Sequence, residues 1–153
     1  MKKINVLFVC HGNICRSPMA EYLFKDMVKK KGHEKDFYIA SCATSLEEIG
    51  NPIHYGTKRI LDSLGIDSSS KRARRITKED YDLFDYIILM DKENEYALKY
   101  IIKNDPLNKI HMLLEYAGLK RDISDPWYTH DFQKTYQDIM LGLNAFYNAL
   151  NID

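Results

Sequence analysis

The chain has 153 residues, of which 45% are hydrophobic and 29% are charged, so we expect one compact domain spanning residues 1–153 with a single core. Its 22 basic and 22 acidic side chains leave no net charge, which argues against nucleic acid and an anionic membrane as partners. Three cysteines without a CxxC pair argue against a disulfide framework and a zinc site, and favour a reducing, cytoplasmic setting.

Apolar runs of strand length alternate with helical patterns along the chain, an order typical of a parallel α/β sheet. The first run, residues 4–10, is short and no small-residue cleavage site follows it, so we expect a strand rather than a signal peptide. A helix beginning at Pro18 follows, with apolar residues at a period near 3.6 and a C-terminal Gly32.

Further strands are expected at about residues 37–41, 86–90 and 110–113. Further helices are expected at about 57–64, from an N-cap at Thr77, at 92–103 and from 132 to 146. These elements predict a four-stranded parallel sheet flanked by helices on both faces, with the carboxyl ends of the strands at one edge.

The most informative segment joins the first strand to the first helix and reads Cys10-His11-Gly12-Asn13-Ile14-Cys15-Arg16-Ser17. Backbone N–H groups and the positive end of the helix dipole favour a bound anion at such a turn. The same field favours a thiolate at Cys10, and the planar guanidinium of Arg16 can bind two oxyanion oxygens. Ser17 is expected to be the N-cap before Pro18. The spacing therefore predicts a phosphate-binding loop in which sulfur attacks phosphorus.

In the alternative interpretation, Cys10 only fills the core and Arg16 is an ordinary surface charge. A cation in the first helical turn opposes the helix dipole, so Arg16 is unfavourable there unless an anion binds beside it. The left-handed backbone that Gly12 and Asn13 tolerate also suits a loop that curls round a ligand.

Residues 125–128, Asp-Pro-Trp-Tyr, form a second motif. They resemble the general-acid loop of the low-molecular-weight protein tyrosine phosphatases, and residues 9–18 resemble the phosphate-binding loop of the same family. Shorter stretches that match in type and order lie at 41–45, 50–52, 73–77 and 85–91. The resemblance implies hydrolysis of phosphotyrosine and small aryl phosphates through a cysteinyl phosphate. It implies no metal or organic cofactor.

The resemblance also implies roles for individual side chains. Cys10 is the expected nucleophile, Arg16 stabilises the phosphoryl group, and Asp125 is the acid and then the base. Substrate contacts are expected from the loop, from Glu47 and from an aromatic wall, that is from His11, Gly12, Asn13, Ile14, Cys15, Ser17, Glu47, Trp127 and Tyr128. Asn13, Ser17 and Ser41 are expected to brace the loop by hydrogen bonds. The expected partners are a phosphotyrosine-containing protein or peptide and inorganic phosphate or a similar oxyanion.

Several residues qualify this interpretation. Members of the family often carry histidine where Lys71 stands, and an aromatic residue where Glu47 stands. We expect Glu47 to favour substrates with basic residues beside the phosphotyrosine. Asp91 is expected to orient Arg74 or the acid loop. Cys15 is expected to protect Cys10 by forming a disulfide with it. In the alternative, Cys15 is only a small buried side chain that fills space.

Three other functions are alternatives to this one. An arsenate reductase of the same fold needs a downstream pair of resolving cysteines, and no cysteine follows Cys42. A protein-arginine phosphatase of the same family carries threonine where this chain has Ile14. A phosphopeptide-binding pseudophosphatase is disfavoured because Cys10, Arg16 and Asp125 are all present.

Overall fold

Four parallel strands form the centre of the protein. The computed structural model describes residues 2–152, in which one sheet has the strand order β2-β1-β3-β4. The strands are β1 (Ile4–Cys10), β2 (Phe37–Ala43), β3 (Tyr86–Leu89) and β4 (Ile110–Met112). All three pairings are parallel, which confirms the predicted sheet.

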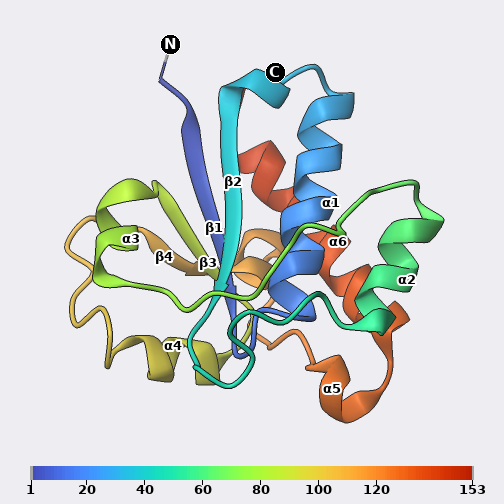
Figure 1. Ribbon diagram of the computed structural model, residues 1–153. Helices are drawn as coiled ribbons and strands as arrows, with labels where there is room; N and C mark the ends of the chain where they lie inside the picture. The colour runs from blue at the N-terminus through green and yellow to red at the C-terminus, as the bar shows by residue number, and fades with distance from the viewer. Residues whose placement is uncertain (1, 153) are drawn as a thin grey trace.

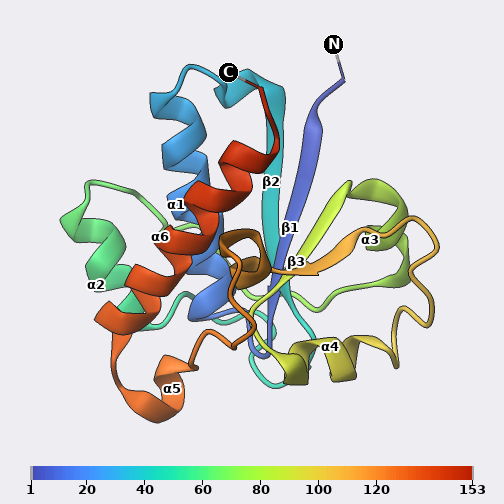
Figure 2. The ribbon, with the colours of Figure 1, turned by 180° about the vertical axis from the view of Figure 1, so that it is seen from behind.

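Helices cover both faces of this sheet, as predicted (Figures 1 and 2). One side carries α1 (Arg16–Lys30), α2 (Tyr55–Ser63) and α6 (Phe132–Ala149), and the other carries α3 (Lys78–Leu83) and α4 (Lys92–Leu98). The short helices are η1 (Glu34–Asp36), η2 (Leu113–Ala117) and α5 (Pro126–Thr129). In the described part of the chain, no helix combines the length and apolar character needed to cross a membrane.

Alternation along β1 divides the interior into two clusters. Val6, Phe8 and Cys10 belong to the cluster that also contains the buried side chains of α1 and α6. Leu7 and Val9 belong to the cluster on the opposite face, which includes residues of α3 and α4. Successive side chains of a strand point to opposite faces, so a strand that is apolar throughout must be covered on both sides. β1 therefore holds its C-terminal Cys10 rigidly between two layers.

Several expected element boundaries differ from the observed ones by a few residues, and three of these differences affect the description below. β2 continues through Cys42 and Ala43, because its pairing with β1 runs to the Cys10–Ala43 partner pair. α4 ends at Leu98 rather than near residue 103. The following N–H groups of Tyr100 and Ile101 bond to carbonyls three residues back, at 3.2 and 2.9 Å. The chain thus tightens into turns there instead of continuing the α-helix. The third difference, the start of α1, concerns the site itself.

The strand order places a binding site at one edge. β1 lies between β2 and β3: the chain runs from β1 to β2 on one side and returns to β3 on the other, so the strand order reverses beside β1. In open α/β sheets, ligands bind outside the carboxyl ends of strands at such a switch point. Cys10 ends β1, and Asp91 follows β3, so this edge brings the two residues together.

Candidate active site

The loop after β1 turns its backbone carbonyl groups outward. Four of them accept hydrogen bonds from segments around the loop, at 2.9–3.1 Å: Cys10 O from Thr44 N, His11 O from Ser45 N, Ile14 O from His54 N and Cys15 O from Thr57 Oγ1. Two N–H groups of the loop point the other way, toward the sulfur. The N–H groups of Asn13 and Ser17 lie 3.3 and 3.4 Å from the Cys10 Sγ atom. The loop is therefore a cradle of donors around the sulfur, as an anion site requires.

Asn13 fixes the shape of this cradle from behind. Its φ angle is 59°, in the left-handed region, which asparagine tolerates better than most residues. Its Nδ2 group donates to Ser17 Oγ at 2.8 Å and to Ser41 Oγ at 2.9 Å. Its Oδ1 atom accepts from the backbone N–H of Arg74 at 3.2 Å. The three side chains expected to brace the loop are thus in direct contact.

Helix α1 begins earlier than the sequence suggested. Its first residue is Arg16 and its N-cap is Cys15, so the expected N-cap at Ser17 is wrong. The Ser17 hydroxyl lies 3.0 Å from Cys10 Sγ and 3.3 Å from the Cys42 carbonyl, and it serves the nucleophile rather than the helix end. Within the described residues, no side chain caps α1, which leaves its first N–H groups for a ligand.

Arg16 is a buried cation whose side chain is held at one end. The residue is 2% exposed. Its NH1 group donates to Asp91 Oδ2 at 2.6 Å and to the Ile123 carbonyl at 2.9 Å. Its NH2 group lies 3.4 Å from Asp125 Oδ2. Burial lowers the pKa of Arg16, but the charges of Cys10, Asp91 and Asp125 outweigh it and raise that pKa above its ordinary value.

Asp91 does not orient Arg74, contrary to one expectation. Arg74 pairs with Asp80 at 3.0 Å, whereas Asp91 binds Arg16 through Oδ2 and caps α4 by accepting from Asn94 N through Oδ1, at 2.8 Å. The contact between Asp91 and Arg16 was not expected from the sequence. One signal could have found it: Asp91 follows a strand adjacent to β1 in a parallel sheet, so both residues belong to the same edge.

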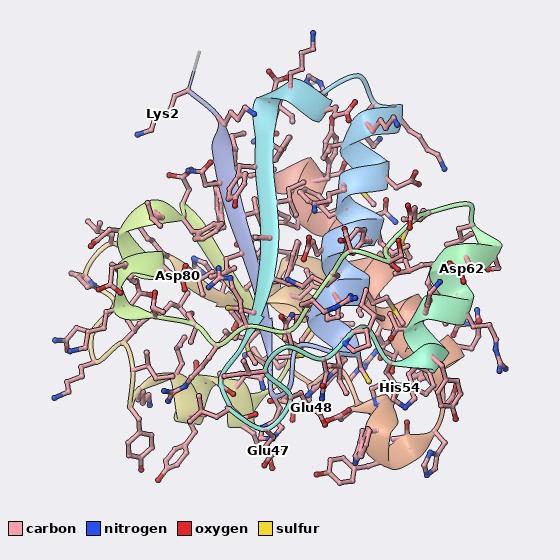
Figure 3. All side chains as sticks on the ribbon, viewed as in Figure 1. Lys2, Glu47, Glu48, His54, Asp62 and Asp80 are labelled. Atoms are coloured by element: carbon pink, nitrogen blue, oxygen red, sulfur yellow. The ribbon has the colours of Figure 1, made fainter. Side chains whose placement is uncertain are left out.

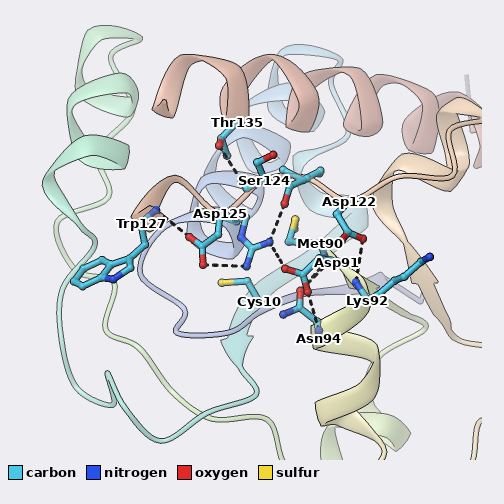
Figure 4. A network of polar contacts seen from close by, with 12 residues as sticks. Cys10, Met90, Asp91, Lys92, Asn94, Asp122, Ser124, Asp125, Trp127 and Thr135 are labelled. Atoms are coloured by element: carbon cyan, nitrogen blue, oxygen red, sulfur yellow. Dashed lines mark hydrogen bonds and ion pairs between the residues drawn. The ribbon is translucent and has the colours of Figure 1, made fainter. Parts of the chain in front are cut away.

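Asp125 lies at the mouth of the loop as the N-cap of α5. Its Oδ1 atom accepts from Trp127 N at 3.0 Å, and its side chain is 23% exposed. Proline at the first helical position and a capping aspartate explain why the helix begins here. Asp125 is thus positioned by its bond to Trp127 (Figure 4), and its Oδ2 atom faces Arg16.

A cavity of about 100 Å³ opens over the sulfur. Its lining comprises the loop, the acid segment and the segment after β2: Cys10, His11, Gly12, Ile14, Cys15, Arg16, Glu47, Glu48, Asp125, Trp127 and Tyr128. Asn13 and Ser17 are 1% and 0% exposed and lie behind the lining. Glu48 was not expected, although it neighbours Glu47, and both side chains lie at the loop end of the protein (Figure 3).

The other two cysteines occupy different surroundings. Burial raises the pKa of the Cys15 thiol, and the charge of Cys10 beside it adds to this rise. Cys42 belongs to the apolar cluster on the opposite sheet face from Cys10, and burial raises its pKa also. Cys15 lines the cavity with Cys10, whereas Cys42 does not. Among residues 2–152, no group of three His, Cys, Asp or Glu side chains is placed to hold a metal ion.

Comparisons with known proteins agree with this geometry. A family described as "Low molecular weight phosphotyrosine protein phosphatase" matches residues 5–153. The low-molecular-weight protein-tyrosine-phosphatase YfkJ of Bacillus subtilis is 43% identical over 141 residues, which cover 91% of this chain and 90% of that protein. The human low-molecular-weight phosphotyrosine protein phosphatase is 40% identical over 149 residues, covering 93% and 92% of the two chains.

Solved structures share the fold over the same length. The crystal structure of YfkJ superposes with a TM-score of 0.92 at 40% identity, covering 98% of this chain and 96% of that one. The crystal structure of DARP, a Drosophila arginine phosphatase, superposes with a TM-score of 0.87 at 31% identity, covering 100% and 99%. With its Cys10 loop, buried Arg16 and Asp125 in this common frame, the chain belongs to the low-molecular-weight phosphotyrosine protein phosphatase family.

Proposed function

We propose that the protein hydrolyses phosphotyrosine in proteins or peptides, and small aryl phosphates, through a phosphate ester of the Cys10 sulfur. One observation carries the proposal. The Cys10 Sγ atom lies among inward-facing loop N–H groups, next to a guanidinium that is 2% exposed and fixed by Asp91. Fixed donors and a fixed cation stabilise the charge of a phosphoryl group without having to reorganise.

The reaction has two steps on these residues. In the first, the Cys10 thiolate attacks phosphorus, the bond from phosphorus to the aryl oxygen breaks, and Asp125 protonates the departing oxygen. In the second, the Asp125 carboxylate takes a proton from water, whose oxygen attacks phosphorus and releases the thiolate and inorganic phosphate. The loop N–H groups and Arg16 hold the phosphoryl oxygens in both steps.

The contacts of Arg16 indicate how it serves both steps. NH1 is bonded to Asp91 and Ile123 within 2.9 Å, so this end of the side chain is anchored. NH2 faces Asp125 at the longer distance of 3.4 Å. Phosphoryl oxygens that replace this weaker contact would gain a charge-assisted hydrogen bond and would release the Asp125 carboxyl group toward the leaving oxygen.

The test compares turnover of phosphotyrosine, phosphoserine and phosphoarginine peptides of one sequence. We expect the phosphotyrosine peptide to be hydrolysed fastest, and an acid-quenched reaction to show a phosphate adduct on Cys10 by mass spectrometry. Cys10→Ser should abolish turnover while vanadate still binds. Cys42→Ser, which changes a cysteine across the sheet, is the matched control and should remain active. Retention of a tenth of wild-type turnover by Cys10→Ser would contradict the proposal.

The same panel tests a second candidate, protein-arginine phosphatase. It is favoured by the structural similarity to DARP, the Drosophila arginine phosphatase. It is disfavoured by Ile14, which lines the cavity where that branch is expected to carry threonine. Preferred hydrolysis of the phosphoarginine peptide would reassign the substrate.

We further propose a cytoplasmic setting, supported by three unpaired cysteines in the described chain; cell fractionation tests it.

A further inference from the structure

We propose that Glu21 is a positioning residue that sets the direction of the hydrogen bonds running through Ser41, Asn13 and Ser17 to the Cys10 nucleophile. This inference rests on the proposed function of Cys10. Glu21 belongs to α1 and lies one turn beyond the phosphate-binding loop. It does not line the cavity, so it has no direct contact with the substrate there.

Glu21 is a buried carboxylate with partners on both oxygens. It is 4% exposed. Oε1 accepts from Ser41 Oγ at 2.5 Å and lies 3.3 Å from Lys71 Nζ. Oε2 accepts from Lys25 Nζ at 2.6 Å. A buried charge is retained only where it is paired and hydrogen-bonded, and this one is paired with two ammonium groups.

The direction of the bonds follows from donor and acceptor capacity. An ionised carboxylate can only accept, so the single hydrogen of Ser41 is committed to Glu21. Ser41 Oγ must then accept from Asn13 Nδ2, and this orients the amide with its Oδ1 toward the N–H of Arg74. The second hydrogen of the same amide points to Ser17 Oγ, at 2.8 Å.

Ser17 is the last member and the one that touches the nucleophile. Since its oxygen already accepts from Asn13, its own hydrogen is left to donate. Two acceptors are in reach, Cys10 Sγ at 3.0 Å and the Cys42 carbonyl at 3.3 Å. A thiolate is the stronger acceptor because it is charged. The network therefore directs a hydroxyl donor at the sulfur when the sulfur is ionised, which favours the reactive form.

Lys71 favours the same direction of these hydrogen bonds. Its ammonium group also donates to the Ser41 carbonyl, at 2.8 Å. An ammonium has three hydrogens and no lone pair, so it can never accept from Ser41 and compete with Glu21. A neutral imidazole has an acceptor nitrogen, and a histidine at position 71 would lack this one-way property. The departure at Lys71 thus has a physical consequence in this chain.

The test is Glu21→Gln, read out by the pH dependence of Cys10 alkylation with iodoacetamide, with the adduct located by mass spectrometry. Glutamine has one neutral acceptor oxygen where glutamate has two anionic ones. Its NH₂ group can donate to Ser41 Oγ, which reverses the direction of that hydrogen bond. We expect alkylation of Cys10 at a pH below the wild-type midpoint to slow roughly three- to tenfold, and the midpoint to move upward. Loss of the Glu21 charge would by itself favour a nearby thiolate and lower the midpoint, so an upward shift reports the changed hydrogen bonds.

Asp26→Asn is the matched control. Asp26 is on the same helix and pairs with a lysine four residues on, Lys30, at 2.9 Å, but it has no bond to Ser41. It should leave the alkylation midpoint unchanged. An unshifted midpoint in folded Glu21→Gln, or an equal shift in Asp26→Asn, would overturn the proposal.

A double-mutant cycle separates action through Ser41 from a general loss of structure. Ser41→Ala alone should shift the midpoint in the same direction, and Glu21→Gln should add nothing in that background. Additive shifts would show that Glu21 does not act through Ser41. Failure of the proposed function is a different result: Cys10 of the wild type would then alkylate like an ordinary thiol, with no raised reactivity at low pH for Glu21 to support.

Discussion

The floor and the rim of the candidate active site are built in opposite ways. The floor, residues 10–17, is bonded on its outer side to the segment that follows β2, to the N-cap of α2 and to α2 itself. The rim, which consists of Glu47, Glu48, Trp127 and Tyr128, projects into solvent, and Trp127 and Tyr128 are 50% and 76% exposed. In the floor, Asn13, Arg16 and Ser17 are buried and bonded to protein atoms, whereas the exposed side chains of the rim have water as an alternative partner.

This contrast separates two tasks. Stabilising a transferring phosphoryl group needs donors that are already in place, and burial of Arg16, Asn13 and Ser17 at 2% exposure or less provides that. Choosing among substrates needs only differences in contact energy at the edges. Substitutions in the floor should therefore change rates by orders of magnitude, and substitutions in the rim should change preferences by small factors.

Asp125 lies between the two regions, and its substitution has the largest expected effect after removal of the Cys10 nucleophile. Asp125→Asn should lower kcat for phosphotyrosine roughly 10²–10⁴-fold, because the proton donor is lost. Asparagine is also a good N-cap, so the bond to Trp127 N survives and α5 stays formed. The measurement is kcat across aryl phosphates, and the loss should shrink as the leaving group becomes more acidic.

Asp131→Asn is the control for this substitution, since Asp131 caps α6 by accepting from Lys134 N at 2.9 Å and does not line the cavity. Its kcat should match the wild type. A near-normal rate in Asp125→Asn would assign the acid to another residue and would place Asp125 with the rim.

Arg16→Lys tests whether the floor depends on geometry or only on charge. A lysine keeps the positive charge but cannot bond Asp91, Ile123 and a phosphoryl group in one plane. We expect kcat/KM to fall roughly 10²–10³-fold, the scale for loss of one preorganised charge-stabilising group. Arg121→Lys is the control. Arg121 also donates two hydrogen bonds to a buried carboxylate, that of Asp138, both at 2.9 Å, but it does not line the cavity. Equal activity of Arg16→Lys and wild type would remove the geometric argument.

Cys15→Ser probes a floor residue that the proposed phosphoryl transfer does not use. Peroxide converts the Cys10 thiolate to a sulfenic acid, and the Cys15 thiol can then form a disulfide with loss of water. Burial and the charge of Cys10 raise the pKa of Cys15, and oxidation of Cys10 removes that charge. We expect the wild type to recover activity in dithiothreitol and to show a Cys10–Cys15 link by mass spectrometry.

Cys15→Ser should instead go on to irreversible sulfinic acid and recover poorly, while Cys42→Ser should behave as the wild type, since Cys42 packs on the other face of the sheet. Full recovery of activity by Cys15→Ser would contradict the protective role and would mean that Cys15 only fills space in the interior.

Glu47→Tyr is the smallest expected effect and belongs to the rim. Glu47 Oε2 lies 3.0 Å from His11 Nε2, and both side chains are about half exposed or more, at 70% and 49%. Loss of the charge should improve kcat/KM a few-fold for peptides with acidic residues beside the phosphotyrosine, because exposed charges contribute little. Glu47→Gln isolates the charge from the ring. Equal kcat/KM of the wild type for acidic and basic peptides at low salt would remove Glu47 as a selector.

The sequence was informative where the physical signal is local. Solid apolar runs and the 3.6 period indicated the strands and helices, and Cys10 and Arg16 indicated the loop through their spacing. The capping box of Thr77 and Asp80 was also recognisable, and α3 begins there. Each of these features needs only neighbours along the chain.

The sequence was less informative where side chains choose between local and distant partners. Ser17 has the composition of an N-cap, yet its hydroxyl goes to Cys10. Asp91 is a capping residue by its context and does cap α4, but its second oxygen goes to Arg16, 75 residues away. Glu21 resembles an ordinary exposed helix position until Ser41 and Lys71 are placed beside it. Such choices depend on strand register, which one sequence does not specify.

The anchoring of Arg16 has a consequence for synthesis of the chain. Cys10 and the loop leave the ribosome early, but the two acceptors of Arg16 NH1 come from Asp91 and from Ile123 near the C-terminal helices. At ordinary rates of translation, the interval is on the order of ten seconds. During that time the cysteine is present without its fixed guanidinium, so a nascent chain should be inert toward phosphate esters and should acquire activity only when its last third has docked.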